Sequence, residues 1–324
     1  MTKAFRFYET GGTEVLKWED VEIDAPGKGE VLIRQAAVGL NYIDVYHRAG
    51  LYPLQLPSGI GVEGAGVVEE VGRGVKEFKK GDRVAYMGGP LGAYSEERIM
   101  PANRLVKLPK EIDFETAAAI MLQGLTAHML IRKVYKVNKG DTVLFHAAAG
   151  GVGLIACQWL KHLGVKVVGT VGSEEKAKLA KRHGCTWPVN YRKDDFLETV
   201  KKVTKGKGVP VVYDSVGKDT FMKSLDCLAP RGMLVVFGNA SGPVDNFNLN
   251  LLTPRGSLYV TRPTIMNYTS DRDEMVKATR ELFKVVKSGA VKVRIGQAYA
   301  LKDAAQAHKD LEARKTTGST VLLP

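Results

Sequence analysis

The chain has 324 residues, of which 44% are hydrophobic and 25% charged, a composition ordinary for a folded protein of about two domains and unlike that of a disordered chain. Three widely spaced cysteines argue against a disulfide framework or a structural zinc site, and no stretch approaches the roughly 20 apolar residues of a membrane span. The first residues lack the apolar run of a signal peptide, so we expect a cytoplasmic protein. The formal net charge of +12 indicates attraction to anions, but the basic residues are scattered, which favours a solvated surface over a nucleic-acid site.

Residues 1–123 contain many short β-branched and apolar runs separated by Gly and Pro, for example Glu30 to Val38, Gly64 to Val71 and Arg83 to Met87. Such spacing predicts a partly closed β-barrel and not a parallel sheet. We expect this part to be the catalytic domain.

From residue 124 to residue 263 the pattern changes to alternating strands and helices. The expected strands are 142–148, 166–172, 186–191, 209–217, 232–240 and 257–263, with helices near 151–163, 174–183, 194–204 and 218–228. Six such strands predict an α/β, doubly wound sheet whose ligand crevice lies at their carboxyl ends.

The first of these strands leads into a small-residue turn, Ala148-x-Gly150-x-x-Gly153, which is the dinucleotide-binding fingerprint with alanine in its first glycine slot. Gly150 would let backbone N–H groups approach a pyrophosphate, and Gly153 would let the following helix pack close to the strand. The alternative is a tight connection between strand and helix that binds no ligand. The fingerprint predicts that the cofactor contacts Ala149, Gly150, Gly151, Val152 and Gly153.

The second strand ends in Gly172-Ser173, where a site for NADH would carry a carboxylate, and Lys176 follows within one helical turn. A hydroxyl and an ammonium can hold a 2′-phosphate by charge-assisted hydrogen bonds, so these residues favour NADPH. Two alternatives stay open. Ser173 is equally suited to cap the next helix, and Glu174 or Glu175 could reach a ribose instead.

The turns after the later strands complete the predicted cofactor site, because the carboxyl ends of parallel strands share one edge of the sheet. The candidates are Ser215, Val216, Phe237, Gly238, Asn239, Ser241, Thr261 and Arg262.

Residues 264–324 mix an amphipathic helix (Asp273 to Lys287), a strand-like piece (Val291 to Ile295), a second helix (Lys302 to Arg314) and an apolar run (Ser319 to Leu323). We expect this segment to return to the first domain and complete it.

These residues resemble the zinc-free quinone oxidoreductases, also called zeta-crystallin-like proteins, of the medium-chain dehydrogenase/reductase superfamily. The stretch from Gly140 to Lys161 matches the quinone oxidoreductase signature, and Gly61 to Val68 with Gly81 to Val84 resembles the superfamily's barrel signature. The resemblance implies a GroES-like catalytic barrel and a Rossmann domain that binds NADPH, in a homodimer paired through the run Gly256 to Thr261.

Zinc-dependent relatives place ligands in Gly-x-Cys and Gly-His-Glu segments, and a catalytic zinc needs about three protein ligands. The corresponding positions here are Asn41 and Val62. Because valine cannot bind zinc, we expect no metal.

Hydride transfer to a quinone needs less electrophilic help than transfer to a simple ketone, since the ring delocalises the negative charge. We therefore assign Asn41 as an amide donor, and Tyr46 and Tyr52 as donors with flat faces for an aromatic acceptor. Either tyrosine could instead be a packing residue. Asp44 could orient a neighbour, and His47 is a surface residue or a proton relay.

Thr126 could touch the nicotinamide or the substrate near the expected domain junction. The resemblance adds two further cofactor contacts, Tyr191 and Arg314, beside the adenosine 2′-phosphate. Arginine suits a phosphate because its guanidinium is planar and permanently charged, although a solvated helix end is the alternative for Arg314.

Two other hypotheses remain. Reduction of the double bond of alkenals or enoyl thioesters uses the same scaffold and hydride donor. RNA binding is suggested by the basic charge and by the zeta-crystallin resemblance, but the chain shows no aromatic-basic RNA motif, so we rank it below both reductases.

Overall fold

The computed structural model describes residues 1–324, and the chain divides into two compact units. The first unit consists of Met1–Gln123, Asp271–Arg280 and Val293–Pro324, and the second of Gly124–Ser270 and Glu281–Lys292. The α/β fold class predicted from the sequence is confirmed by the parallel sheet of the second unit and the antiparallel strands of the first.

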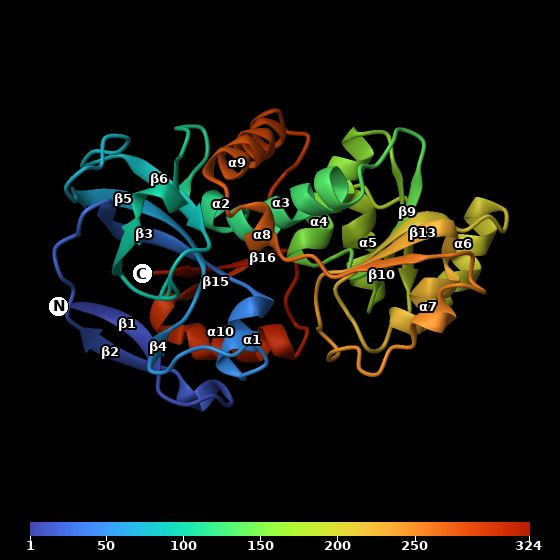
Figure 1. Cartoon of the computed structure of the whole chain (residues 1–324), viewed down its shortest axis with the longest axis horizontal. Helices are drawn as coiled ribbons and strands as arrows, with labels where there is room; N and C mark the ends of the chain where they lie inside the picture. Colours follow the sequence, from blue (N-terminus) through green and yellow to red (C-terminus); the bar gives the residue numbers. More distant parts are fainter. The chain divides into compact units, whose positions relative to one another are not determined.

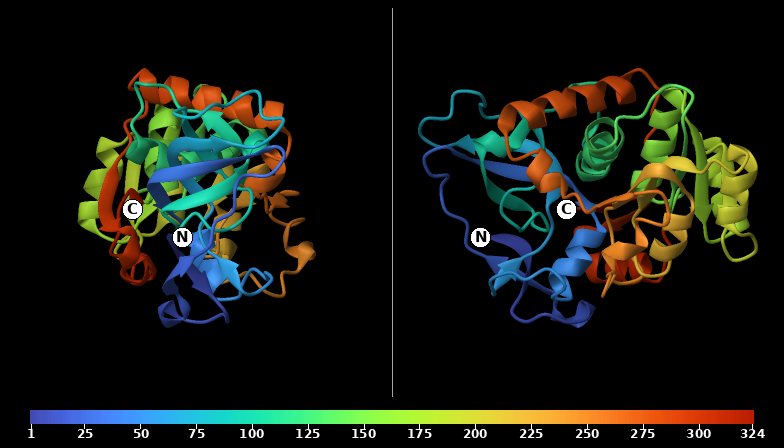
Figure 2. Two further views of the ribbon diagram at one scale, coloured as in Figure 1. Left: turned by 90° about the vertical axis from the view of Figure 1, so that its left-hand side faces the viewer. Right: turned by 45° about the vertical axis from the view of Figure 1, so that its right-hand side comes forward.

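The first unit is built on antiparallel strands (Figure 1; Figure 2). Its largest sheet runs in the order β15-β16-β3-β5-β6-β8, with β7 paired to β3, and a smaller sheet runs β2-β1-β4. The strands are β1 (Thr2–Phe7), β2 (Lys17–Val21), β3 (Glu30–Leu40), β4 (Ser58–Gly59), β5 (Glu63–Val71), β6 (Arg83–Met87), β7 (Glu97–Pro101), β8 (Leu105–Lys107), β15 (Ile295–Ala300) and β16 (Ser319–Leu323).

Short helices accompany these strands. They are α1 (Tyr42–Arg48), α2 (Phe114–Ala118) and α10 (Ala304–Glu312), while α3 (Met121–His128) and α9 (Arg272–Lys287) each contain residues of both units. Apolar side chains of β3, β5, β6 and α10, among them Ile33, Val68, Tyr86 and Ala307, form a continuous buried core.

The carboxyl-terminal segment pairs with the first unit, because β16 lies antiparallel to β3 and parallel to β15. The strand expected at Val291 to Ile295 is wrong: β15 begins only at Ile295. The backbone N–H groups of Val291 and Lys292 instead bond to the Val285 carbonyl at 3.0 Å and to Gln158 Oε1 at 2.9 Å, so this alternating stretch has no neighbouring strand to pair with.

The second unit contains six parallel strands in the order β11-β10-β9-β12-β13-β14, which is doubly wound. Its elements are β9 (Thr142–Phe145), α4 (Gly151–His162), β10 (Lys166–Val171), α5 (Glu174–Arg182), β11 (Trp187–Asn190), α6 (Phe196–Thr204), β12 (Val209–Asp214), α7 (Phe221–Asp226), β13 (Leu228–Val236), β14 (Tyr259–Thr261) and α8 (Ile265–Tyr268). Phe196 and Val200 of α6 and Leu225 of α7 pack on Leu144 and Val212 of the sheet. The three cysteines are buried and unpaired.

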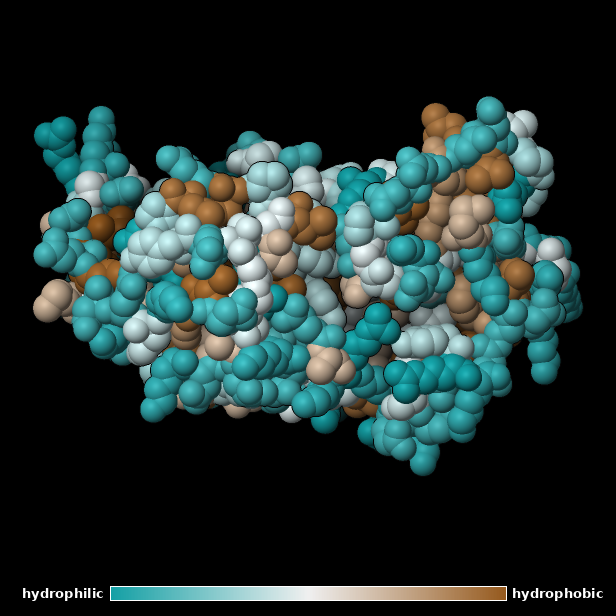
Figure 3. All heavy atoms as spheres, turned by 90° about the horizontal axis from the view of Figure 1, so that it is seen from below, coloured by the Kyte–Doolittle hydropathy of each residue, from teal (hydrophilic) through white to brown (hydrophobic).

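No helix of the chain has both the length and the apolar character needed to cross a membrane. On the face of the molecule that Figure 3 displays, apolar side chains form small separate groups among hydrophilic ones.

Candidate functional site

The turn between β9 and α4 brings the helix unusually close to the strand. Gly150 is the residue before the first turn of α4, and Ala147 adopts the left-handed region at φ 54°. A methyl group on Gly153 would lie 2.8 Å from Ala148 Cα and closer still to the Ala147 carbonyl oxygen. Gly153 therefore meets the close-packing requirement of the fingerprint, and no side chain caps the amino-terminal end of the 12-residue helix α4.

Alanine in the first glycine slot is accommodated by the neighbouring strand. The Ala148 N–H bonds to the Thr170 carbonyl at 3.0 Å, and a methyl group on Gly169 would lie 2.7 Å from Ala148 Cβ. Because Gly169 on β10 has no side chain, there is room beside the turn for the methyl group of Ala148.

At the end of β10, Ser173 caps helix α5 by accepting a hydrogen bond from the Lys176 N–H at 3.2 Å, so the capping alternative is confirmed. Glu174 accepts from Asn190 Nδ2 at 2.9 Å, which holds this carboxylate at the side of the helix. A methyl group on Gly172 would lie 2.9 Å from the Tyr191 hydroxyl, so Tyr191 packs over Gly172. Contact of Ser173 or Lys176 with a phosphate stays a prediction.

The strand β12 ends at Asp214, earlier than expected, because its buried carboxylate turns the chain. Asp214 Oδ1 accepts from the N–H groups of Val216 at 2.7 Å and Gly217 at 3.1 Å. The Ser241 N–H then bonds to the Val216 carbonyl at 2.8 Å, which ties the loops after β12 and β13 together. The signal in the sequence was an acid between a buried strand and a Ser-Val-Gly turn.

Except for Thr126, the predicted cofactor residues of the second unit end or follow its strands and so lie towards one edge of its sheet, since all six strands are parallel. Arg262 comes directly after β14 and donates to the Val236 carbonyl at 3.3 Å. Thr126 lies in helix α3. Arg314 belongs to the first unit, and its expected place inside the last helix is wrong: α10 ends at Glu312, and Arg314 adopts φ 58° beyond it.

In the first unit, Asn41 stands at the amino-terminal end of α1, with 6% of its surface exposed. Its Nδ2 donates to Glu63 Oε2 at 2.6 Å, and its Oδ1 accepts from Gln123 Nε2 at 3.1 Å. Its backbone N–H donates to Asp44 Oδ2 at 2.9 Å. The side-chain amide is therefore oriented by Glu63 and Gln123, both of which sequence reasoning missed; the signal for Glu63 was a carboxylate inside the apolar stretch Gly61 to Val68.

The two candidate tyrosines lie against each other. The rings of Tyr46 and Tyr52 are 5.2 Å apart in an edge-to-face arrangement, and both are partly exposed. His47 is half-buried, contrary to the expected surface position, and burial lowers its pKa. Binding of an aromatic acceptor by this pair stays a prediction.

A chain of mostly buried polar groups holds helix α1 in place through its residues Asp44 and Arg48. Arg48 donates to His308 Nδ1 at 3.2 Å, which leaves the hydrogen on Nε2, 3.1 Å from the Tyr94 hydroxyl. Tyr94 donates to Asp44 Oδ2 at 3.0 Å, and Arg48 binds Glu312 through both terminal nitrogens at 3.0 and 2.9 Å. Burial lowers the pKa of His308 to about 3, so its imidazole is neutral, as this chain of donors requires.

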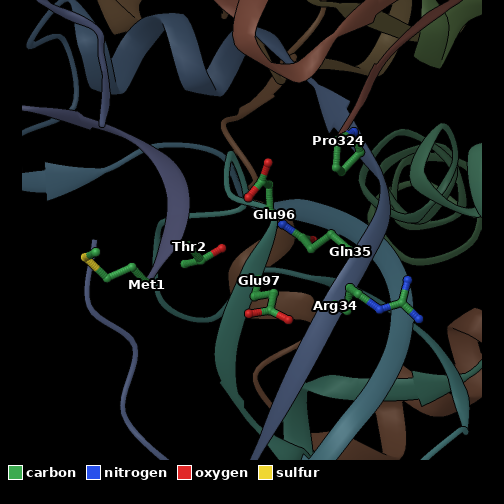
Figure 4. Close-up of a pocket in the computed structure, with 7 residues that line it drawn as sticks. All are labelled: Met1, Thr2, Arg34, Gln35, Glu96, Glu97 and Pro324. Carbon is green, nitrogen blue, oxygen red and sulfur yellow. The ribbon is translucent and has the colours of Figure 1, made fainter. Parts of the chain in front are cut away.

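A pocket of about 360 Å³ also opens in the first unit, between the carboxylates of Glu96 and Glu97 and the side chains of Arg34 and Gln35 (Figure 4). None of the predicted site residues lines it. The pocket is therefore separate from the Asn41 cluster.

The side chains around Asn41 do not form a metal-ligand set. No group of three or more His, Cys, Asp or Glu residues in the chain could hold a metal ion.

Comparisons with known proteins agree with this arrangement. The family described as "Alcohol dehydrogenase GroES-like domain" matches residues 27–110, and "Zinc-binding dehydrogenase" matches residues 151–284. A quinone oxidoreductase of Pseudomonas aeruginosa is 55% identical over 325 residues, covering 100% of both chains. A 2-haloacrylate reductase of Burkholderia is 47% identical, covering 100% of this chain and 99% of its own.

Among solved structures, the quinone oxidoreductase of Escherichia coli in complex with NADPH superposes with a TM-score of 0.98 at 49% identity, covering 99% of this chain and 100% of its own. Identity at this level over the whole length identifies a family and not merely a fold. The chain belongs to the quinone oxidoreductase family of the medium-chain dehydrogenase/reductase superfamily.

Proposed function

We propose that this chain reduces quinones with NADPH by direct hydride transfer, without a metal ion. The observation that carries the proposal is the edge of the parallel sheet, where the fingerprint turn is followed by Ser173 and Lys176 in place of a ribose-binding acid. The NADPH complex of the Escherichia coli relative supports the same cofactor.

The residues at this edge fit such a cofactor. The absence of a side chain at Gly150 leaves the turn backbone open to a pyrophosphate at the start of α4. Lys176 and Arg314 would neutralise a 2′-phosphate, and Tyr191 offers a ring that is 43% exposed for stacking. Ser215, Val216, the loop 237–241, Thr261, Arg262 and Thr126 would surround the remainder.

Bound NADPH supplies a hydride. The chain's own residues would orient the acceptor: Tyr46 and Tyr52 would contact its ring, and the amide hydrogen of Asn41 that Glu63 does not bind would donate to the oxygen that gains negative charge. Delocalisation over the quinone ring keeps this charge small enough for hydrogen-bond donors to suffice.

Turnover of a small para-quinone and of a 2-alkenal by the same enzyme sample, each with NADPH, tests the acceptor class. The proposal predicts a higher kcat/KM for the quinone. The second candidate, reduction of a conjugated double bond, is favoured by the 47% identity to the 2-haloacrylate reductase, and a strong preference for the alkenal or for a 2-haloacrylate would reverse the order.

The remaining assignments are part of this proposal. The catalytic domain comprises residues 1–123 and 264–324 and the nucleotide-binding domain residues 124–263, in a cytoplasmic homodimer. Support for the dimer is the edge strand β14, whose Tyr259 is 57% exposed. Sedimentation velocity tests the dimer.

Binding to single-stranded RNA that persists in moderate salt would favour the RNA hypothesis, whereas salt-labile binding reflects nonspecific charge.

A further inference from the structure

The carboxyl group of Glu63 is enclosed by protein on every side. Glu63 is the first residue of β5 and has no exposed surface. Its Oε1 accepts from the Leu122 N–H at 2.6 Å and its Oε2 from Asn41 Nδ2 at 2.6 Å. A methyl group on Gly39 would lie 2.7 Å from Glu63 Cδ and closer still to Oε2, so β3 is shaped to admit this carboxyl.

The carboxyl decides which way the Asn41 amide faces. Both Glu63 oxygens face N–H donors, so the Asn41 nitrogen and not its oxygen must turn towards Glu63. On the other side, Gln123 Nε2 donates to Asn41 Oδ1, and Gln123 Oε1 accepts from the Ser319 hydroxyl at 2.7 Å. Reversing the amide would place like groups together at both contacts and leave these buried groups unpaired.

We propose that Glu63 is a positioning residue for the reaction: it binds one amide hydrogen of Asn41 so that the other is presented to the substrate oxygen that gains negative charge. The inference rests on the proposed function of Asn41. On this proposal Glu63, which has no contact with solvent, stabilises the transition state by orienting Asn41.

The charge on Glu63 adds a second, measurable property. Burial, with a smaller contribution from the neighbouring Asp44 carboxyl, raises the pKa of Glu63 to about 8, although the hydrogen bonds from Asn41 and Leu122 lower it. The Tyr86 hydroxyl, which Arg98 contacts at 3.3 Å, and the Tyr94 hydroxyl, bound to Asp44, are the other ionisable groups that interact with it. The carboxylate accepts at both oxygens, whereas a protonated Glu63 carries a hydrogen on one of them, so the Asn41 amide should be held better and hydride transfer should become faster as pH rises through about 8.

The test is the substitution Glu63→Gln, with Glu96→Gln as its matched control. A glutamine has one acceptor oxygen where the carboxyl has two, so one of the two N–H donors loses its partner and the Asn41 amide is released. Glu96 also accepts from a backbone N–H, that of Lys3 at 3.1 Å, but does not contact Asn41. We expect Glu63→Gln to lower kcat for a small para-quinone about 10- to 100-fold, with KM and the Kd for NADPH within about twofold of wild type, and Glu96→Gln to leave all three unchanged.

Two further results distinguish positioning from a structural effect. In the Asn41→Ala background, Glu63→Gln should lower kcat little further, because Glu63 acts through the missing amide. The wild-type rise in kcat through about pH 8 should be absent in Glu63→Gln. Wild-type kcat in Glu63→Gln, additive losses in the double variant, or an unchanged pH profile would each overturn the inference.

If Glu63→Gln does not fold, the wild-type enzyme still gives an answer. The side-chain amide NMR resonances of Asn41 should shift with an apparent pKa near 8, and resonances that do not move between pH 6 and 9.5 would contradict the proposed contact. Failure of the proposed function is a different result, namely wild-type enzyme that does not oxidise NADPH with a quinone.

Discussion

The fingerprint turn makes two separable demands on its glycines, and the structure predicts different outcomes when each is replaced by alanine. At Gly153 the added methyl meets backbone atoms, 2.8 Å from Ala148 Cα and closer to the Ala147 carbonyl oxygen, so helix α4 must move away from β9. Such overpacking costs about 2 kcal/mol, within the usual range of about 1–3, and a loss of this size lowers Tm by roughly 4–8 °C in a domain of this length.

At Gly150 the added methyl meets one atom, the Ala147 carbonyl oxygen at 3.3 Å, and the backbone at φ −79° suits any residue. Gly150→Ala should therefore change stability by less than about 1 kcal/mol. It should still weaken NADPH at least tenfold, because the methyl occupies the path by which the pyrophosphate reaches the backbone N–H groups.

Thermal unfolding without ligand, together with calorimetric titration of NADPH, separates the two effects. The expected results are an unstable, weakly binding Gly153→Ala and a stable, weakly binding Gly150→Ala. The reasoning would be refuted by a Gly153→Ala variant as stable as wild type, or by a Gly150→Ala variant with wild-type affinity.

The other predictions concern the phosphate, the acceptor and pH. Lys176→Ala and Arg314→Ala should each weaken NADPH about tenfold and NADH little, since a charged hydrogen bond contributes about 1.5–3 kcal/mol; equal losses for both nucleotides would remove the phosphate assignment. Tyr46→Phe and Tyr52→Phe should raise KM for a quinone severalfold and leave the Kd for NADPH unchanged. Replacing either tyrosine by alanine should raise KM more. A wild-type KM in all four variants would show that the pair does not bind the acceptor. Burial raises the pKa of Asp44 to about 7, so its contribution to stability is present at low pH and is lost as pH rises towards about 7. Chemical denaturation between pH 4 and 7 should show a steeper fall in the free energy of unfolding for wild type than for Asp44→Asn. Equal slopes would contradict this.

Local sequence patterns were sufficient for the second unit. The strand β9, which ends at Phe145 and not at the expected residue 148, and the glycine turn after it are contiguous, so the periodicity and the turn chemistry can be recognised without knowing any distant contact. Element ends were less predictable. β12 stops at Asp214 because of a side-chain hydrogen bond, and the alternating stretch at 291–294 pairs with no strand because its donors are bound by Val285 and Gln158.

The environment of Asn41 could not be predicted in the same way. Its amide is held by residues 22 and 82 positions away, Glu63 and Gln123, and these pairings arise only when β5 and α3 meet β3. A single sequence does not show which strands become neighbours. An acid in an apolar strand does indicate that some buried partner exists, and this signal would have identified Glu63.

The central claim is that NADPH delivers its hydride to a quinone without a metal ion, and one measurement tests it most directly. Enzyme shown by elemental analysis to contain less than about 0.1 equivalent of zinc or any other transition metal should be mixed with NADPH and a small para-quinone, and the absorbance of NADPH followed in a stopped-flow instrument. The account predicts oxidation at the same rate before and after treatment with a chelator. Loss of activity on chelation with recovery on adding zinc, or no oxidation of NADPH in either sample, would contradict it.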